Sequence, residues 1–402
     1  MKKQLLVLAS AICLTGAAGA SLVSCNNDSR VQVGLIALHD ENSTYDKNFI
    51  DAFKAAADAK GVKAVIKTGI PEGTECYEAA ADLADQGCKF VFADSFGHED
   101  HMIKAAKEFK DVQFSHGTGT KAHTENLSNY HNAFASIYEG RYIAGVAAGL
   151  KLKSMIEANP NTSHKLGYVG AYTYAEVISG YTAYYLGAKS IVDDVTMEVQ
   201  FTGSWYDEAS EKDAAKKLIA NGCSVISQHA DSWGAPNACE EAGVPNITYN
   251  GSTESNCPNT YVISSKINWQ PYFEDCFDKI LNGGTIATDY TGSLGDTLYV
   301  GSVVNTTLGA KTAVSGTEAK LNEVHAALKN GSLKVFDTSK FTVDGKTVTS
   351  YLADVNTDAE FKGDTEVIKT VNGISYFAES EFRSAPYFDL KIDGISLLNT
   401  KF

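Results

Sequence analysis

The amino-acid sequence predicts an α/β protein with two Rossmann-like lobes, each built on a parallel sheet, followed by a C-terminal extension. Three observations support this prediction. Short apolar runs alternate with amphipathic segments of helical length, which is the pattern of βαβ units and a parallel sheet. The pattern restarts near residue 165, and 402 residues exceed the usual size of one hydrophobic core. A segment of the first half also recurs in the second half.

The composition is that of a folded, acidic protein. Hydrophobic residues make up 44%, and 49 acidic against 34 basic residues give a formal charge of −15. So acidic a chain lacks the basic surface that nucleic acid requires, which excludes that class of partner. After residue 30, no apolar run approaches the roughly 18 residues of a membrane span.

The N-terminus has the features of an export signal. Two lysines precede an apolar segment at 5–14, and small residues follow, as in a secretory signal peptide. Leu22-Val23-Ser24-Cys25 resembles a bacterial lipobox. We therefore expect a signal peptide at 1–24, lipidation of Cys25, a tether at 25–30 and a protein anchored to the membrane in the cell envelope. The alternative is an ordinary signal with a chance cysteine.

The remaining cysteines give no metal signature. They lie at Cys76, Cys88, Cys223, Cys239, Cys257 and Cys276. Their spacing matches neither CxxC pairs nor zinc sites, and export permits an oxidising compartment. Buried thiols and up to three disulfides both stay open.

The first lobe is predicted from four strands that alternate with three helices. Strands are expected at 31–36, 62–66, 88–92 and 112–115, with helices around Phe49 and Phe53, at 75–86 and at 99–109. A polar turn at 39–48 joins the first strand to the first helix. Small ligands bind at such crossovers, at the carboxyl end of a parallel strand.

A long helical pattern at 137–156 leads into the second lobe. There, strands are expected at 165–170 and 195–202 and helices at 175–188 and 209–220. Two further strands at 247–249 and 261–264 and a helix at 270–281 are interpreted as a return to the first lobe. The predicted division is 31–140 plus about 247–290 for lobe 1, 141–246 plus about 291–330 for lobe 2, and 331–402 for an extension packing on both. Hinge strands would join the lobes.

An internal repeat links the two halves. Leu-Ala-Asp-Gln-Gly-Cys at 83–88 precedes Ala-Asp-Ser-Phe-Gly at 93–97, and Leu-Ile-Ala-Asn-Gly-Cys at 218–223 precedes Ala-Asp-Ser-Trp-Gly at 230–234. Each copy ends a helix at glycine, forms a strand and closes with an Asp-Ser-aromatic-Gly turn. Because the turns match, we expect structurally related lobes.

Four motifs, in order, resemble a known family. They are Asp40 with Tyr45-Asp46-Lys47-Asn48-Phe49, Glu139-Gly140-Arg141-Tyr142-Ile143-Ala144-Gly145, Gly203-Ser204-Trp205-Tyr206-Asp207 and Asn268-Trp269-Gln270-Pro271-Tyr272. The chain resembles, over residues 31–334, the basic membrane protein (PnrA-like) family of substrate-binding lipoproteins of ABC importers. The resemblance implies a type I periplasmic binding protein fold, capture of a purine nucleoside or nucleobase, and ABC permease subunits as partners. It implies a monomer without cofactor, metal or enzymatic activity.

The same resemblance implies the site residues. Phe49 and Trp205 match two rings that sandwich the purine, and Trp269 belongs to a stretch of one branch. Asp40 matches a base-binding carboxylate, with the Asn48 amide nearby. Asp100 lies near a second family carboxylate, a place for which Asp94 competes. Competing interpretations are a core position for Phe49 and helix capping for Asp40 and Asp100.

One departure concerns the sugar. The family grips ribose with an aspartate and a lysine, but Asn250 replaces the aspartate, and Lys266 follows Ser264-Ser265 in an uncertain register. Nucleoside and free base therefore both stay open.

Other classes are weaker alternatives. An enzyme would need a motif such as GxSxG, a P-loop or GxGxxG, and none is present. His98-Glu99-Asp100-His101 suggests a metal site, but a solvated helix start explains it better. A binding protein of the same fold for a sugar or signalling molecule, and a surface adhesin or sensor lipoprotein, stay open.

Overall fold

A computed structural model describes residues 28–294, 303–305, 308–356 and 362–402. The chain forms two compact units, residues 1–30 and residues 31–402. In the first unit, Arg30 pairs with Asp28 at 2.6 Å. The predicted signal peptide and Cys25 lie outside the described residues. Everything below concerns residues 31–402.

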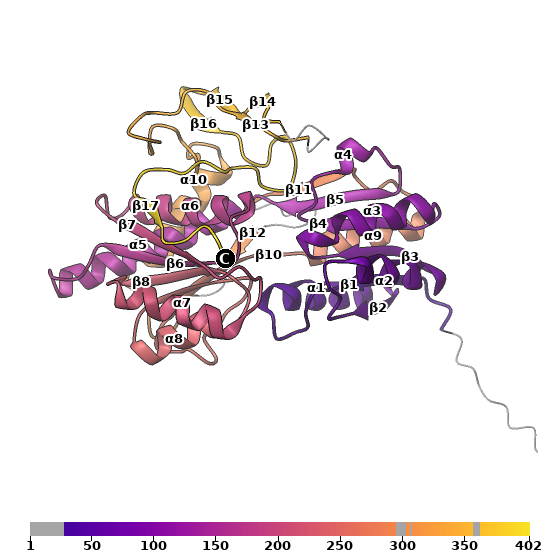
Figure 1. Ribbon diagram of the computed structural model, residues 1–402, viewed down its shortest axis with the longest axis horizontal. Helices are drawn as coiled ribbons and strands as arrows, with labels where there is room; N and C mark the ends of the chain where they lie inside the picture. The colour runs from indigo at the N-terminus through magenta and orange to yellow at the C-terminus, as the bar shows by residue number, and fades with distance from the viewer. Residues whose placement is uncertain (1–27, 295–302, 306–307, 357–361) are drawn as a thin grey trace, which may run out of the picture. The chain divides into compact units, whose positions relative to one another are not determined.

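The first lobe is a parallel sheet with the order β2-β1-β3-β4-β5-β11. Its strands are β1 (Gln32–Ile36), β2 (Lys63–Lys67), β3 (Cys88–Ala93), β4 (Gln113–Gly117), β5 (Tyr130–Ala135) and β11 (Asp289–Gly292). Its helices are α1 (Thr44–Lys60), α2 (Thr74–Asp85), α3 (Glu99–Glu108), the short α4 (Ala122–Glu125) and α9 (Gln270–Asn282), with a 3-10 turn η1 (Phe96–His98). The pair α1 and α9 and the pair α2 and α3 pack as separate layers on this sheet (Figure 1).

Helix α1 begins directly after the loop that follows β1. Ser43 is its N-cap, and the Ser43 side chain accepts a hydrogen bond from the Asp46 backbone N–H, which satisfies one of the free donors of the first turn. Gly61 ends the helix at φ +66°, a conformation that glycine adopts without strain. Phe49 and Phe53 face the core, so the helix is fixed at both ends and along its buried side.

The second lobe has the sheet order β17-β7-β6-β8-β9-β10-β12. Its strands are β6 (Lys165–Gly170), β7 (Thr196–Phe201), β8 (Val225–His229), β9 (Asn246–Tyr249), β10 (Tyr261–Ile267), β12 (Val303–Asn305) and β17 (Ile395–Leu397). Its helices are α5 (Ile137–Ala158), α6 (Ala175–Lys189), α7 (Glu208–Ala220) and α8 (Gly234–Ala242). Neighbouring strands are parallel, except that β12 runs antiparallel to β10.

Two glycines allow the close packing of α5 on α6. A Cβ at Gly145 would lie 2.0 Å from the Tyr184 carbonyl oxygen, and one at Gly187 would lie 2.1 Å from the Tyr142 carbonyl oxygen. Both distances are far below van der Waals contact. The helices therefore approach each other so closely that no side chain fits at these positions.

The two lobes are equivalent in strand order, as the internal repeat predicts. The order β2-β1-β3-β4-β5 corresponds to β7-β6-β8-β9-β10, and the repeated turns follow β3 and β8. The predicted α/β fold with two lobes is confirmed.

The predicted return to the first lobe at residue 247 is wrong. Strand β9 pairs with β8, and β10 pairs with β9, so both extend the second sheet. The chain returns only at α9, which packs on α1, and at β11, which pairs with β5. It crosses between the lobes after β5, after β10 and after β11.

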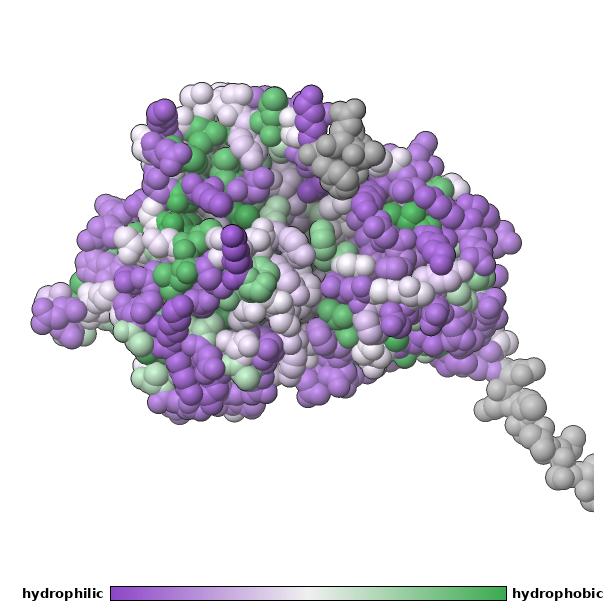
Figure 2. All heavy atoms as spheres, viewed as in Figure 1, coloured by the Kyte–Doolittle hydropathy of each residue, from purple (hydrophilic) through white to green (hydrophobic). Residues whose placement is uncertain are grey.

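The C-terminal part of the chain touches both lobes. Helix α10 (Thr317–Lys329) packs on α5. Beyond it, the short strands β13 (Leu352–Ala353), β14 (Thr365–Glu366), β15 (Ile368–Val371) and β16 (Ile374–Phe377) form two hairpin-like pairs. The Ser384 N–H donates to Asp289 of β11 at 2.8 Å, and β17 joins the edge of the second sheet. Hydrophilic residues cover most of the face seen in Figure 2.

The six cysteines of this unit, all at described positions, are free thiols and buried. Of the two possibilities left open by the sequence, the structure therefore has the buried thiols. Among the helices of the described residues, none has the length and apolar character to cross a membrane.

Candidate ligand-binding site

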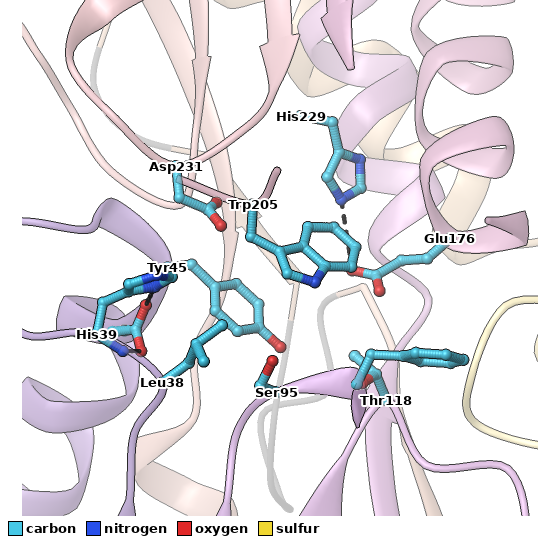
Figure 3. Close-up of a pocket in the computed structure, with 11 residues that line it drawn as sticks. Leu38, His39, Tyr45, Ser95, Thr118, Glu176, Trp205, His229 and Asp231 are labelled. Carbon is cyan, nitrogen blue, oxygen red and sulfur yellow. Dashed lines mark hydrogen bonds and ion pairs between the residues drawn. The ribbon is translucent and has the colours of Figure 1, made fainter. Parts of the chain in front are cut away.

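A narrow cavity of about 20 Å³ lies between the lobes, at the carboxyl ends of the strands (Figure 3). The first lobe contributes Leu38, His39, Tyr45, Asp46, Ser95, Phe96 and Thr118, and the second contributes Glu176, Trp205, His229 and Asp231. His229 is the last residue of β8. The other lining residues lie in the segments that follow strands β1, β3, β4, β6, β7 and β8. Ligands bind at this edge of open α/β sheets.

The loop after β1 fixes a carboxylate at the cavity wall. Asp46 is almost fully buried. It accepts hydrogen bonds from the His39 backbone N–H at 2.7 Å and from the Ser43 hydroxyl at 2.6 Å. Burial raises the pKa of Asp46, but the hydrogen bonds from His39 and Ser43 outweigh it and lower the pKa below its usual value. The loop therefore presents a charged hydrogen-bond acceptor.

The turn after β3 lies beside this carboxylate. Asp94 is fully buried and accepts a hydrogen bond from the Leu38 N–H at 3.1 Å. Burial and the nearby charge of Asp46 raise the pKa of Asp94 well above its usual value. The Tyr45 hydroxyl donates to the Asp94 carbonyl oxygen at 2.8 Å. Tyr45, which lines the cavity, is thereby held in place.

Trp205 belongs to a group of aromatic residues on the second lobe. Its ring lies 5.0 Å from Tyr172 and 6.0 Å from Tyr174, measured between ring centroids. In Figure 3 the Trp205 indole and the Tyr45 ring extend into the cavity from opposite lobes. The cavity thus has aromatic surface on both sides, which suits a flat ligand.

The second lobe also supplies buried polar groups. His229 Nε2 lies 3.4 Å from Glu176 Oε1. Burial lowers the pKa of His229, and the neighbouring Glu176 opposes that shift. Burial and the charge of Asp46 raise the pKa of Asp231 well above its usual value.

The lobes touch across the cavity. The Thr44 N–H donates to the Asp231 carbonyl oxygen at 3.0 Å. The ring centroids of His39 and Tyr206 lie 5.4 Å apart. The rings of Phe96 and Tyr174 stack with centroids 5.0 Å apart and an angle of 27° between their planes. Each contact joins the first lobe to the second, so the structure shows a closed arrangement.

Of the eight residues predicted for the site, all described, Trp205 lines this cavity and the others do not. Phe49 and Trp269 are core residues whose rings lie 4.6 Å apart. Both rings are buried in the core beside α1 and α9, as the core interpretation of Phe49 expects, and their contact with the ligand stays a prediction.

The predicted polar residues have other partners. Asp40 is exposed and accepts from the Asn42 N–H at 2.9 Å within the loop, whereas the N-cap of α1 is Ser43. The Asn48 amide donates to the Ile267 carbonyl oxygen at 2.9 Å, at the end of β10. Asp100 is largely exposed and pairs with Lys121.

The two predicted sugar contacts lie outside the cavity lining. Asn250 is buried at φ +64°, and its side chain opposes the rise in the pKa of Asp231. Lys266 is half-buried on β10, in register with Val304 of β12. Neither lines the cavity.

The internal repeat carried a signal that the residue assignment did not use. Its two turns contain Ser95 and Asp231, which line the cavity, and Asp94, which adjoins it. Asp46 and Tyr45 lay within the motif quoted for Phe49. For Glu176 and His229 the sequence offered no signal.

In the cluster at residues 98–101, His98 and Glu99 have structural roles. The His98 ring contacts the Ile70 carbonyl oxygen at 3.0 Å, and Glu99 accepts from the N–H groups of Thr120 and Lys121. No group of three or more His, Cys, Asp or Glu in the described residues could hold a metal ion.

Comparison with known proteins identifies the family. The family described as ABC transporter substrate-binding protein PnrA-like matches residues 35–370. The chain belongs to this family. Members of the PnrA-like family are solute-binding proteins that act outside the cytoplasm and work with ABC permeases.

Relatives and solved structures agree with this assignment. A purine-binding protein of Brucella abortus is 32% identical over 261 residues, 64% of this chain and 70% of that protein. The nucleoside-binding protein BmpA of Lactococcus lactis is 24% identical over 247 residues, 58% and 67% of the two chains. A solute-binding protein of Aeropyrum pernix shares the fold with a TM-score of 0.64 at 16% identity, covering 76% and 93% of the two chains.

Proposed function

We propose that this PnrA-like protein captures a purine, as free base or nucleoside, between its lobes and delivers it to an ABC permease. The observation that carries the proposal is the cavity between Trp205 and Tyr45, which adjoins the Asp46 carboxylate. The purine-binding name of the Brucella relative supports it.

The physical chemistry of the cavity suits a purine. Stacking a base on an aromatic ring contributes about 1–3 kcal/mol, and Trp205 offers such a face. The edge of a purine carries both donors and acceptors. Asp46 offers a hydrogen-bond acceptor on the first lobe, and Asp231 lines the cavity on the second lobe.

Membrane anchoring is part of the proposal. The lipobox-like sequence ending at Cys25 supports lipidation there, with residues 25–30 as a tether. A monomeric protein held at the outer face of the membrane would release its ligand directly to permease subunits. Labelling with a radioactive fatty acid, compared between the native chain and Cys25→Ala, tests this part.

A sugar is the second candidate. A Haloferax volcanii protein whose name assigns it glucose binding is 33% identical over 204 residues, about half of each chain. Sugars also stack on aromatic rings, so the cavity alone does not separate the two.

Calorimetric titration separates them. The purified protein is unfolded and refolded to remove bound ligand, and is then titrated with adenine, hypoxanthine, adenosine, guanosine, inosine, uridine, ribose, glucose and galactose. We expect tight binding of purines and no heat from the free sugars. Binding of a sugar with silence from every purine would replace the proposal by the second candidate.

A further inference from the structure

Residues 395–402 run along the outer edge of the second sheet, and we call them the edge segment. Strand β17 of this segment pairs in parallel with β7. The Leu398 N–H then donates to the Val199 carbonyl oxygen at 2.8 Å. The family match ends at residue 370. The strand that leads to Trp205 is therefore covered by residues outside the matched region.

Asn399 continues this pairing with its side chain. The Phe201 N–H donates to Asn399 Oδ1 at 2.8 Å, and Asn399 Nδ2 donates to the Phe201 carbonyl oxygen at 3.0 Å. An amide side chain offers both a donor and an acceptor, so it bonds both backbone groups of Phe201. Phe201 is the last residue of β7. The two bonds therefore fix the point at which the strand gives way to the loop that carries Trp205.

Phe402 lies against the same loop. Gly203 has φ +78°, and a Cβ built on it would lie 2.6 Å from the Phe402 ring, so the ring rests directly on the glycine backbone. The centroid of the Phe402 ring lies 5.7 Å from that of Tyr172 and 6.4 Å from that of Phe201. The Phe402 side chain is 59% exposed and does not line the cavity. It therefore covers the loop from the outside.

These contacts lead to the ring that faces the cavity. The centroids of Tyr172 and Trp205 lie 5.0 Å apart, with an angle of 68° between their planes. Leu398 and Trp205 pack against the same hydrophobic cluster of the second lobe. The Trp205 indole extends into the cavity (Figure 3). The edge segment thus reaches Trp205 by two routes, through the backbone of residues 202–204 and through the Tyr172 ring.

The orientation of Trp205 bears directly on ligand affinity. A flat ligand stacks only on a ring that presents its face at the right angle. A side chain that is ordered only when the ligand binds lowers the affinity by the cost of ordering it. The contacts of Asn399 and Phe402 join the protein to itself and do not depend on a bound molecule. They can therefore orient the ring before the ligand arrives.

We propose that Asn399 and Phe402 are positioning residues for ligand capture. They hold the loop at 202–204 and the Tyr172 ring, and these in turn hold the Trp205 indole in the orientation that stacks on the ligand. Neither residue contacts the ligand. The inference rests on the proposed function, because its readout is the binding of a purine against Trp205.

A double-mutant cycle tests the proposal. The refolded protein is titrated by calorimetry with adenosine, guanosine, inosine, adenine and hypoxanthine. Phe402→Ala should raise the Kd of the purine about 2- to 10-fold, because the indole is then ordered only on binding. In the Trp205→Ala background, Phe402→Ala should change the Kd by less than about twofold, since the ring that Phe402 positions is missing. Asn399→Ala should show the same dependence on Trp205.

Two further variants separate positioning from general stability. Phe402→Tyr keeps the ring and should bind within about twofold of the native protein. Leu352→Ala removes another exposed apolar side chain of the extension, 54% exposed, and should bind normally. Thermal unfolding establishes that each variant is folded.

Three results would overturn the inference and leave the proposed function intact. They are native affinity in both Phe402→Ala and Asn399→Ala, an equal loss from Phe402→Ala with and without Trp205, and an equal loss from Leu352→Ala. Silence of the native protein toward all five purines would overturn the proposed function and this inference together.

Discussion

The turn at residues 93–97 in the first lobe and the turn at 230–234 in the second share a sequence pattern and a place in their sheets. Both aspartates are buried with raised pKa values. Each turn is also tied to a glutamate. The Gly97 N–H donates to Glu72 at 2.7 Å, and the Ser232 N–H donates to Glu211 at 3.2 Å. The scaffold of the site is thus duplicated.

The aromatic residues of the two turns differ in use. Phe96 lines the cavity, whereas Trp233 is the N-cap residue of α8 and does not line it. The ring that the second lobe offers comes from Trp205, after β7. The two lobes therefore share the backbone of the turn and the buried acid, but they place rings from different segments at the cavity.

The prediction with the largest expected effect tests whether Phe49 in the first lobe is a core residue or a ligand-binding residue. Phe49 is fully buried against Trp269 and Phe92. Phe49→Ala should lower the free energy of unfolding by about 3–5 kcal/mol, since it leaves a cavity in the core. Chemical denaturation measures this loss. Unchanged stability with lost purine affinity would instead restore Phe49 to the site.

The two glutamates sharpen the comparison through pH. Glu211 is fully buried, and burial raises its pKa to about 7. Because the folded pKa exceeds the unfolded value, this group's stabilisation is present below about pH 4.5 and is lost as pH rises through 7, about 3 kcal/mol in total. Glu211→Gln should remove that part of the pH dependence of unfolding. Glu72 is the exposed glutamate at the corresponding turn of the first lobe, and Glu72→Gln should leave this pH dependence unchanged. Equal effects of the two variants would contradict the assignment of the pH dependence to Glu211.

A pair of tryptophans tests which ring meets the ligand. Trp205→Ala should weaken purine binding by about 1–3 kcal/mol, or about 5- to 150-fold in Kd, because a stacking face is lost. Trp233→Ala, from the repeated turn, is the control and should bind normally. Calorimetry measures both. A loss of affinity in Trp233→Ala but not in Trp205→Ala would reverse the comparison.

The smallest effect concerns the contact between the lobes. Phe96→Leu removes the stack with Tyr174, an interaction of about 0.5–1.5 kcal/mol. We expect the dissociation rate of the ligand to rise about 2- to 10-fold, measured by stopped-flow fluorescence. Leu281→Ala, at an exposed position on α9, should leave the rate unchanged. A slower release from Phe96→Leu would show that the stack does not hold the lobes closed.

The sequence predicted most of the fold because strand and helix periodicity is local. The sequence analysis assigned β9 to the wrong lobe, and the reason is physical. A four-residue buried strand carries no information about which ladder it extends, and pairing with β8 depends on residues far away in the chain. The internal repeat correctly predicted two related lobes, because it is a direct similarity between two segments that lie far apart in the sequence.

The sequence predicted the loop that lines the candidate cavity, but of the eight described side chains predicted for the site only Trp205 lies at this cavity. Tyr45 and Phe49 lie one helical turn apart on the same side of α1, and sequence spacing does not reveal which ring reaches the cavity. Asp40 and Asp46 share one loop. Hydrogen bonds from His39 and Ser43 hold Asp46 at the cavity wall, and such three-dimensional selection cannot be predicted from residue type.

The buried thiols have a practical consequence. From residue 31 onward the chain contains six cysteines, all of them at described positions and buried, and burial raises the pKa of Cys88 and Cys257 to about 11. Thiol reagents attack the exposed thiolate, so these side chains resist labelling in the folded protein. A cysteine introduced at the rim between the lobes would then react selectively with a fluorescent dye. Residues 31–402 thereby form a ready framework for an optical sensor of the captured molecule.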